Sequence, residues 1–91
     1  MSHRILLVED DAINVKFMKV VLTRKGGCDV LISEDVDEII ALAREGKVDA
    51  IIMDISLSRS IHEGRNVDGI YITKLLKADP AAARVPVILA T

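Results

Sequence analysis

The feature that most constrains the fold is a set of four short aliphatic runs spaced along the chain. The runs are residues 5–8, 30–32, 50–53 and 87–90, and they consist of Val, Ile, Leu, Met and Ala. Short apolar runs without polar alternation are typical of strands that are buried on both faces. We therefore expect the four runs to be the strands of one buried sheet.

Apolar residues recur at helical spacing in each of the three intervals between the runs. The first predicted helix lies between a candidate N-cap, Asp11, and the glycine pair at 26–27. The second ends at Gly46, and the third covers residues 68–78. Their apolar positions are Ile13, Phe17, Val20, Val21, Val36, Ile39, Ile40, Ala43, Ile72, Leu75 and Leu76. Strands that alternate with helices pair in parallel, so the sequence predicts an α/β fold.

Acidic residues follow two of these strands directly. Glu9 and Asp10 come after the first run, and Asp54 comes after the third. Parallel strands end at the same edge of a sheet, and ligands bind at that edge. If the strands are ordered second, first, third, fourth, the first and third are neighbours. We then expect Glu9, Asp10 and Asp54 to share one cleft.

Three carboxylates in one cleft require a counter-charge, because two such charges about 4 Å apart repel by roughly 4 kcal/mol at an effective dielectric constant of 20. A divalent cation would supply it. Oxygen ligands without Cys or His favour Mg²⁺ or Mn²⁺ over zinc. Beside such an ion, Asp54 could attack phosphorus and form an acyl phosphate.

Composition and charge exclude several other classes of function. The net charge is −2, and the largest cluster of basic residues is Arg24-Lys25, which is too small for a nucleic-acid-binding surface. The apolar runs are too short to span a membrane. Cys28 is the single cysteine, so an internal disulfide is excluded. We expect one domain, residues 1–91, that acts in the cytoplasm.

Four motifs in order resemble the receiver domains of two-component response regulators. They are residues 5–11 (ILLVEDD), 51–54 (IIMD), 68–69 (DG) and 86–91 (PVILAT). The resemblance implies a flavodoxin-like, doubly wound parallel sheet and a signalling phosphoacceptor, not an enzyme. Its donor would be a histidine kinase or a histidine phosphotransfer protein.

The resemblance also implies a role for individual residues of the site. Asp54 matches the phosphoacceptor, and Thr91 matches the residue whose hydroxyl bonds the phosphoryl group. Glu9 and Asp10 match the acidic pair that binds Mg²⁺ with Asp54. Ser56 matches the position whose backbone carbonyl reaches the metal.

The sequence departs from the family pattern at its end. Receiver domains have five strand–helix units, whereas these 91 residues stop after the fourth strand and do not include the fourth helix, the fifth unit or its lysine. Whether the 91 residues are the natural chain or a fragment of a longer one stays open. An uncovered fourth strand is a template for pairing with another chain, which predicts a homodimer or a domain-swapped oligomer.

A second departure is an enlarged loop over residues 55–67, since Asp68 follows Asp54 by 14 residues. The loop has Ser58 where many members have proline. It is either a solvated insertion, with a solvated His62, or a source of cations. In the second case Arg59 or Arg65 would pair with the phosphoryl group in place of the lysine.

Two other functions remain open at this stage. One is a pseudo-receiver that cannot be phosphorylated and only binds partner proteins or dimerises. The other is a phosphatase of the haloacid dehalogenase type, which also forms an aspartyl phosphate. That class needs a second Asp two residues after the nucleophile, where this chain has Ser56.

Overall fold

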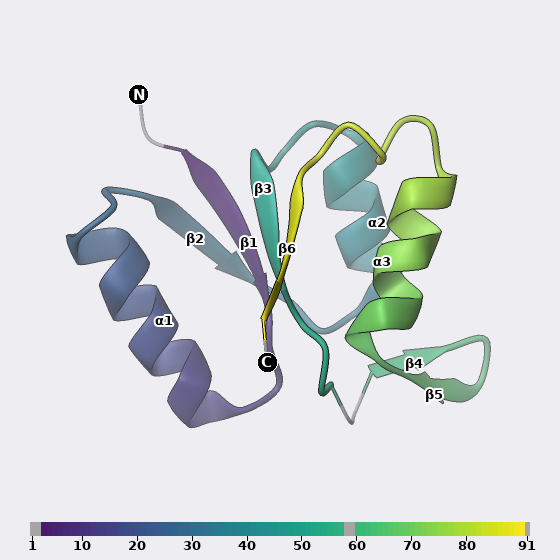
Figure 1. Cartoon of the computed structure of the whole chain (residues 1–91), viewed down its shortest axis with the longest axis horizontal. Helices are drawn as coiled ribbons and strands as arrows, with labels where there is room; N and C mark the ends of the chain where they lie inside the picture. Colours follow the sequence, from purple (N-terminus) through teal and green to yellow (C-terminus); the bar gives the residue numbers. More distant parts are fainter. Residues whose placement is uncertain (1–2, 58–59, 91) are drawn as a thin grey trace.

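The computed structural model describes residues 3–57 and 60–90, which form a three-layer α/β fold (Figure 1). A parallel sheet of four strands lies in the middle. Helix α1 covers one of its faces, and helices α2 and α3 cover the other. The elements are β1 (Arg4–Val8), α1 (Ala12–Arg24), β2 (Asp29–Ile32), α2 (Val36–Arg44), β3 (Ala50–Asp54), β4 (Ser60–His62), β5 (Arg65–Val67), α3 (Gly69–Ala78) and β6 (Val87–Ala90).

The strand order of the large sheet is β2-β1-β3-β6, which confirms the order expected from the sequence. All three strand pairs are parallel. In the central pair Ile5 lies opposite Ala50 and Val8 lies opposite Met53. The predicted flavodoxin-like, doubly wound sheet is therefore confirmed, and both central strands end at the same edge.

Polar side chains begin the three helices, and the first of them, Asp11, is the N-cap that the sequence indicated. Asp11 caps α1 by accepting hydrogen bonds from the backbone N–H groups of Ile13 and Asn14, at 2.9 and 3.3 Å. Asp35 caps α2, and Asp68 caps α3. Gly27 and Gly46 have φ values of 63° and 68°, which glycine adopts without strain after a helix. None of the described helices has the length and apolar character that crossing a membrane would require.

The apolar face that we predicted for α1 is wrong. Ile13 and Phe17 are 79% and 68% exposed, and Val20 and Val21 are exposed as well. The half-buried positions of α1 are instead Val15, Met18 and Leu22, which also recur at helical spacing. Two apolar stripes share this helix, and periodicity alone does not indicate which one faces the sheet.

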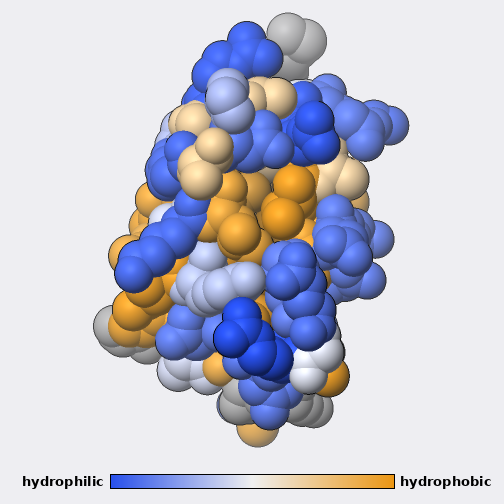
Figure 2. Space-filling model, turned by 90° about the vertical axis from the view of Figure 1, so that its right-hand side faces the viewer, coloured by the Kyte–Doolittle hydropathy of each residue, from blue (hydrophilic) through white to orange (hydrophobic). Residues whose placement is uncertain are grey.

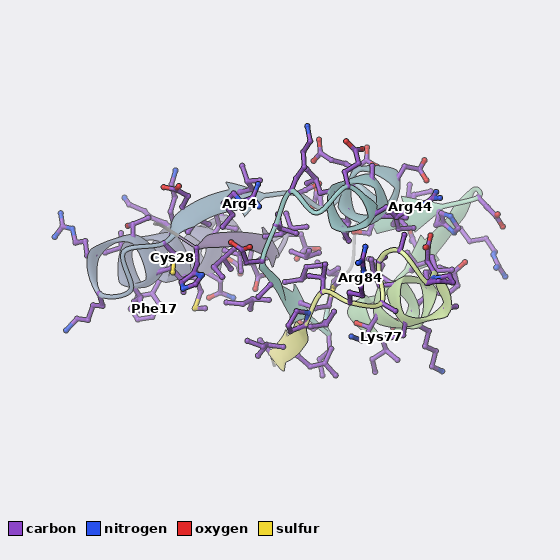
Figure 3. The ribbon with its side chains drawn as sticks, turned by 90° about the horizontal axis from the view of Figure 1, so that it is seen from above. Arg4, Phe17, Cys28, Arg44, Lys77 and Arg84 are labelled. Atoms are coloured by element: carbon purple, nitrogen blue, oxygen red, sulfur yellow. The ribbon has the colours of Figure 1, made fainter. Side chains whose placement is uncertain are left out.

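Burial on both faces is also wrong for the outer strands. Leu31 and Ile32 of β2 are 41% and 42% exposed, and Ile88 and Leu89 of β6 are 56% and 53% exposed. The reason is the arrangement of the layers. Seen from above, α1, with Phe17, lies on one side of the sheet, and α2 and α3 lie together on the other (Figure 3). The lone helix leaves Ile32 and Ile88 uncovered on its face of the sheet. Leu31 and Leu89 lie on the α2–α3 face, but each belongs to a strand with one neighbour among the described residues, at the border of the core.

The main core lies between the sheet and helices α2 and α3. Leu6 and Ile51 from the central strands, Ile39 from α2 and Ile72 from α3 are fully buried there. Viewed from the α2–α3 side, hydrophilic side chains surround a hydrophobic area in the middle of the surface (Figure 2). The fold is thus held mainly by packing on one face of the sheet.

The segment 55–67, predicted to be an irregular loop, contains a β-hairpin. Strands β4 and β5 pair in antiparallel fashion, with Ser60 opposite Val67 and His62 opposite Arg65. The two residues between the strands, Glu63 and Gly64, have φ values of 53° and 79°. Positive φ at both central residues is typical of the type I′ turn, whose twist matches that of the strands it joins.

Contacts with α2 and α3 hold the hairpin in place. Ser60 is 1% exposed, and its hydroxyl donates to the carbonyl oxygen of Glu34 at 2.7 Å. His62, predicted to be solvated, has its Nδ1 2.9 Å from the hydroxyl oxygen of Tyr71 on α3. Leu57 and Val67 are buried in the main core. The described residues of this connection are therefore folded against the rest of the structure.

We expect Glu63→Asn to stabilise the protein by about 0.5–1 kcal/mol, because Asn tolerates positive φ better than Glu does. Urea unfolding followed by circular dichroism measures the change. Glu63→Gln is the matched control, since it removes the same charge without easing the backbone. Equal midpoints for the Asn and Gln variants would contradict the strained turn.

Candidate functional site

Strand register brings two acidic residues together at the carboxyl edge of the sheet. Val8 lies opposite Met53, so Glu9 follows β1 at the level of Asp54, the last residue of β3. Side chains alternate along a strand, which places Asp54 on the same face as Ile52, the face that α1 partly covers. The Asp54 residue is only 6% exposed. A buried carboxylate therefore stands at the end of a central strand.

Asp10 completes the acidic cluster that the sequence predicted. Glu9, Asp10 and Asp54 each offer one carboxylate oxygen, and these oxygens all lie within 4.8 Å of one another. Carboxylates this close repel by a few kcal/mol at an effective dielectric constant of 20. A cluster of three hard oxygen donors fits Mg²⁺ or Mn²⁺ by charge and by ligand type.

Ser56 donates two hydrogen bonds to the Asp54 carboxylate. Its backbone N–H donates to Oδ1 of Asp54 at 2.9 Å, and its hydroxyl donates to the same oxygen at 2.8 Å. The sequence analysis assigned only the backbone carbonyl of Ser56 to the site and missed its hydroxyl. The signal was present, because Ser two residues after Asp can bond back to the Asp side chain in a turn.

Burial and neighbouring charges raise the pKa of Glu9. Loss of solvent around the carboxyl group is the main cause, and the nearby Asp54 and Asp10 add to it. The backbone N–H of Asp11 donates to Oε1 of Glu9 at 3.1 Å, and this hydrogen bond lowers the pKa of Glu9. The Glu9 carboxyl group is therefore protonated more readily in the folded protein than in the unfolded chain. Glu9 therefore contributes stability at low pH that is lost as the pH rises through the raised pKa.

Gly69 lets α3 begin directly against the end of β3. A Cβ at this position would overlap the backbone carbonyl of Asp54 and press on Cα of Ile55. A glycine at position 69, the second residue of the 68–69 motif, is therefore required by this close approach of two backbone segments. The end of β3 and the start of α3 are consequently packed as one unit.

A hollow of about 160 Å³ opens beside Asp54, between α1 and the sheet. Its walls are partly apolar and partly polar, and Glu9 and Asp54 form its acidic part. The lining residues are Leu7, Val8, Glu9, Asn14, Phe17, Met18, Ile52, Asp54 and Ala90. The carboxylates are therefore open to a ligand from the side of α1.

Other predicted site residues fall outside this cluster or outside the described residues. Thr91, Ser58 and Arg59 are not among residues 3–57 and 60–90, so their predicted roles stay predictions. Arg65 lines a separate hollow with Tyr71 on the hairpin side. Asp11 serves as the N-cap of α1, as the sequence indicated.

The sequence and fold were compared with those of known proteins. Residues 5–91 match the sequence model of the response regulator receiver domain. The chain is 33% identical over 91 residues to the polar-differentiation response regulator DivK of Brucella anthropi, and this match covers the whole chain and 68% of that protein. DivK of Brucella ovis matches to the same extent.

Solved structures show the same likeness. The receiver domain of the sensor histidine kinase PA1611 from Pseudomonas aeruginosa superposes with a TM-score of 0.79 at 31% identity, covering all of this chain and 68% of that one. That crystal structure has a magnesium ion coordinated in its active-site cleft. The N-terminal domain of a receiver protein from Methanoculleus marisnigri gives a TM-score of 0.76 at 24% identity, over 98% of this chain and 66% of that one.

We expect Glu9→Gln to stabilise the metal-free protein at pH 7.5 by about 0.5–1 kcal/mol, since it removes a negative charge beside Asp10 and Asp54 while leaving Oε1 in place. Chemical denaturation in the presence of a chelator measures the effect. Glu45→Gln is the control, because the Glu45 side chain is exposed and lies 3.8 Å from the Lys47 ammonium group, outside the acidic cluster. A Glu9 variant less stable than the control would show that the carboxylates do not repel.

Proposed function

Because this chain belongs to the receiver-domain family of response regulators, we propose that it accepts a phosphoryl group on Asp54 from a phosphohistidine. The donor would be a histidine kinase or a histidine phosphotransfer protein. The observation that carries the proposal is the convergence of Glu9, Asp10 and the buried Asp54 at the carboxyl edge of the sheet. Receiver domains are signalling modules, and we propose that this one catalyses at most its own phosphotransfer and dephosphorylation.

We further propose that Mg²⁺, or Mn²⁺ in its place, binds at this cluster. Glu9, Asp10, Asp54 and the backbone carbonyl of Ser56 would hold the ion. When bound, it would neutralise the charge on the phosphoryl oxygens. The close carboxylate oxygens of Glu9, Asp10 and Asp54 support this assignment, as does the magnesium ion in the cleft of the PA1611 receiver domain.

The residues of the chain would then act on the phosphoryl group as follows. A carboxylate oxygen of Asp54 bonds to phosphorus while the bond from phosphorus to the donor's histidine nitrogen breaks, and the imidazole leaves. The short turn after β3 fixes the carboxylate for in-line attack. Thr91 is proposed to donate a hydrogen bond to the transferred group. Pairing of Arg59 or Arg65 with that group also stays a prediction.

The domain boundaries and location are part of the same proposal. We propose that residues 1–91 belong to one receiver domain whose β3–α3 connection, residues 55–67, is enlarged. The proposed donors imply that it acts in the cytoplasm. A pseudo-receiver without phosphoryl chemistry is not favoured, because Glu9, Asp10 and Asp54 all occupy the cluster.

Intact-protein mass spectrometry after treatment with acetyl phosphate and Mg²⁺ tests the proposed phosphorylation. We expect one added phosphoryl group, lost on exposure to base, as acyl phosphates are. Asp54→Asn keeps the size of the side chain and should remain unmodified, while Asp49→Asn, at the opposite edge of the sheet, should behave like the wild type. Equal phosphorylation of the wild type and Asp54→Asn would refute the assignment.

We also propose that the 91-residue chain forms a homodimer, or a domain-swapped oligomer, through β6. This strand pairs with β3 on one side only among the described residues, and its Ile88 and Leu89 side chains are more than half exposed. Exposed apolar edge strands pair readily with other chains.

Sedimentation velocity at increasing concentration tests this association. We expect self-association that Ile88→Lys weakens at least tenfold, because an edge lysine opposes strand pairing. Ile13→Lys is the control, because it introduces the same charge at a more exposed isoleucine that lies on α1 and not on a strand. A wild-type chain that stays monomeric at high concentration would contradict the proposal.

A further inference from the structure

The Ser56 side chain makes a contact that the proposed metal site does not require. A backbone carbonyl at position 56 could reach a metal with any side chain attached. The hydroxyl of Ser56 nevertheless donates to Oδ1 of Asp54 at 2.8 Å, beside the backbone N–H that donates to the same oxygen at 2.9 Å. One carboxylate oxygen therefore receives two hydrogen bonds from one residue.

Two donors on one oxygen restrict the rotation of the carboxylate. The terminal torsion of an Asp side chain is broad, so an unrestrained carboxylate turns easily and exchanges its two oxygens. Asp54 is buried, and hydrogen bonds to a charged group are stronger away from water. The contact thus distinguishes Oδ1, which accepts from Ser56, from Oδ2.

We propose that the Ser56 hydroxyl is a positioning group for phosphoryl transfer, which keeps Oδ1 as a hydrogen-bond acceptor and presents Oδ2 to phosphorus. This inference rests on the proposed function of Asp54. When the bond between Oδ2 and phosphorus forms, Oδ1 becomes the carbonyl oxygen of the acyl phosphate. Oδ1, which is also the oxygen left for the proposed ion, can accept the hydrogen bond of the Ser56 hydroxyl before and after the reaction.

Positioning of this kind affects the rate of the chemical step more than the binding of the donor. Removing the hydroxyl leaves the backbone N–H bond to Oδ1 and the backbone carbonyl in place. Donor binding and metal affinity should therefore survive the change. Ser56 is itself exposed, which leaves room for the additional methyl group of threonine.

The test compares Ser56→Ala and Ser56→Thr with the wild-type chain. Phosphorylation by acetyl phosphate is followed by intact mass at several donor concentrations with saturating Mg²⁺, and the Mg²⁺ dissociation constant is measured separately by calorimetry without the donor. We expect Ser56→Ala to lower the maximal rate about tenfold, or about 1.4 kcal/mol. The half-saturating donor concentration and the Mg²⁺ affinity should stay within about twofold. Ser56→Thr should restore the rate.

Each other outcome overturns the inference in a recognisable way. A rate for Ser56→Ala equal to or above that of the wild type shows that the hydroxyl does not position the nucleophile. A Thr variant as slow as the Ala variant, with weakened Mg²⁺ binding in both, assigns Ser56 a structural role. If the wild type itself is not phosphorylated, the proposed function fails, and this inference fails with it.

Discussion

The pairing of β1 with β3 is the constraint on which the rest of the site depends. This parallel register places Val8 opposite Met53, so the residues that follow the two strands emerge at one level. A slip of one residue would turn Asp54 to the opposite face of the sheet and away from Glu9. Apolar packing of the central strands therefore fixes the position of charged groups that would otherwise repel one another.

One face of the sheet carries most of the apolar core, and the other face carries the hollow beside the acidic cluster. The main core lies on the α2–α3 side and contains the fully buried Leu6, Ile51 and Ile72. The α1 side is more open, and the hollow beside Asp54 lies there. A ligand can approach the carboxylates on this side without opening the main core. The hairpin of β4 and β5 is anchored on the α2–α3 side, through Ser60 and His62.

Much of the fold could be predicted because its signals are local and repeated. The four aliphatic runs became the strands of the large sheet, and Asp11 capped its helix as expected. General rules made the strands parallel, while the order came from the resemblance to receiver domains, because doubly wound sheets have more than one common order. That order was enough to bring Glu9, Asp10 and Asp54 together.

Sequence reasoning failed where a pattern had two solutions or a contact was not periodic. Helix α1 has two apolar stripes, and tertiary packing selected Val15 and Met18 over Phe17. The hairpin was missed because Glu63 is an unusual residue at a positive φ, so the turn resembled a loop. The hydroxyl of Ser56 was missed because a single serine is a weak signal until its distance to Asp54 is known.

The central claim is that Glu9, Asp10 and Asp54, at the ends of β1 and β3, bind one metal ion together. Paramagnetic broadening of NMR signals by Mn²⁺ tests this claim most directly. In amide NMR spectra of the metal-free protein, substoichiometric Mn²⁺ should first broaden residues 8–11 and 53–57 together. The effect should require Asp54 and diminish in Asp54→Asn. Broadening that begins at other acidic residues, or that affects the two segments at different Mn²⁺ concentrations, would contradict a shared site.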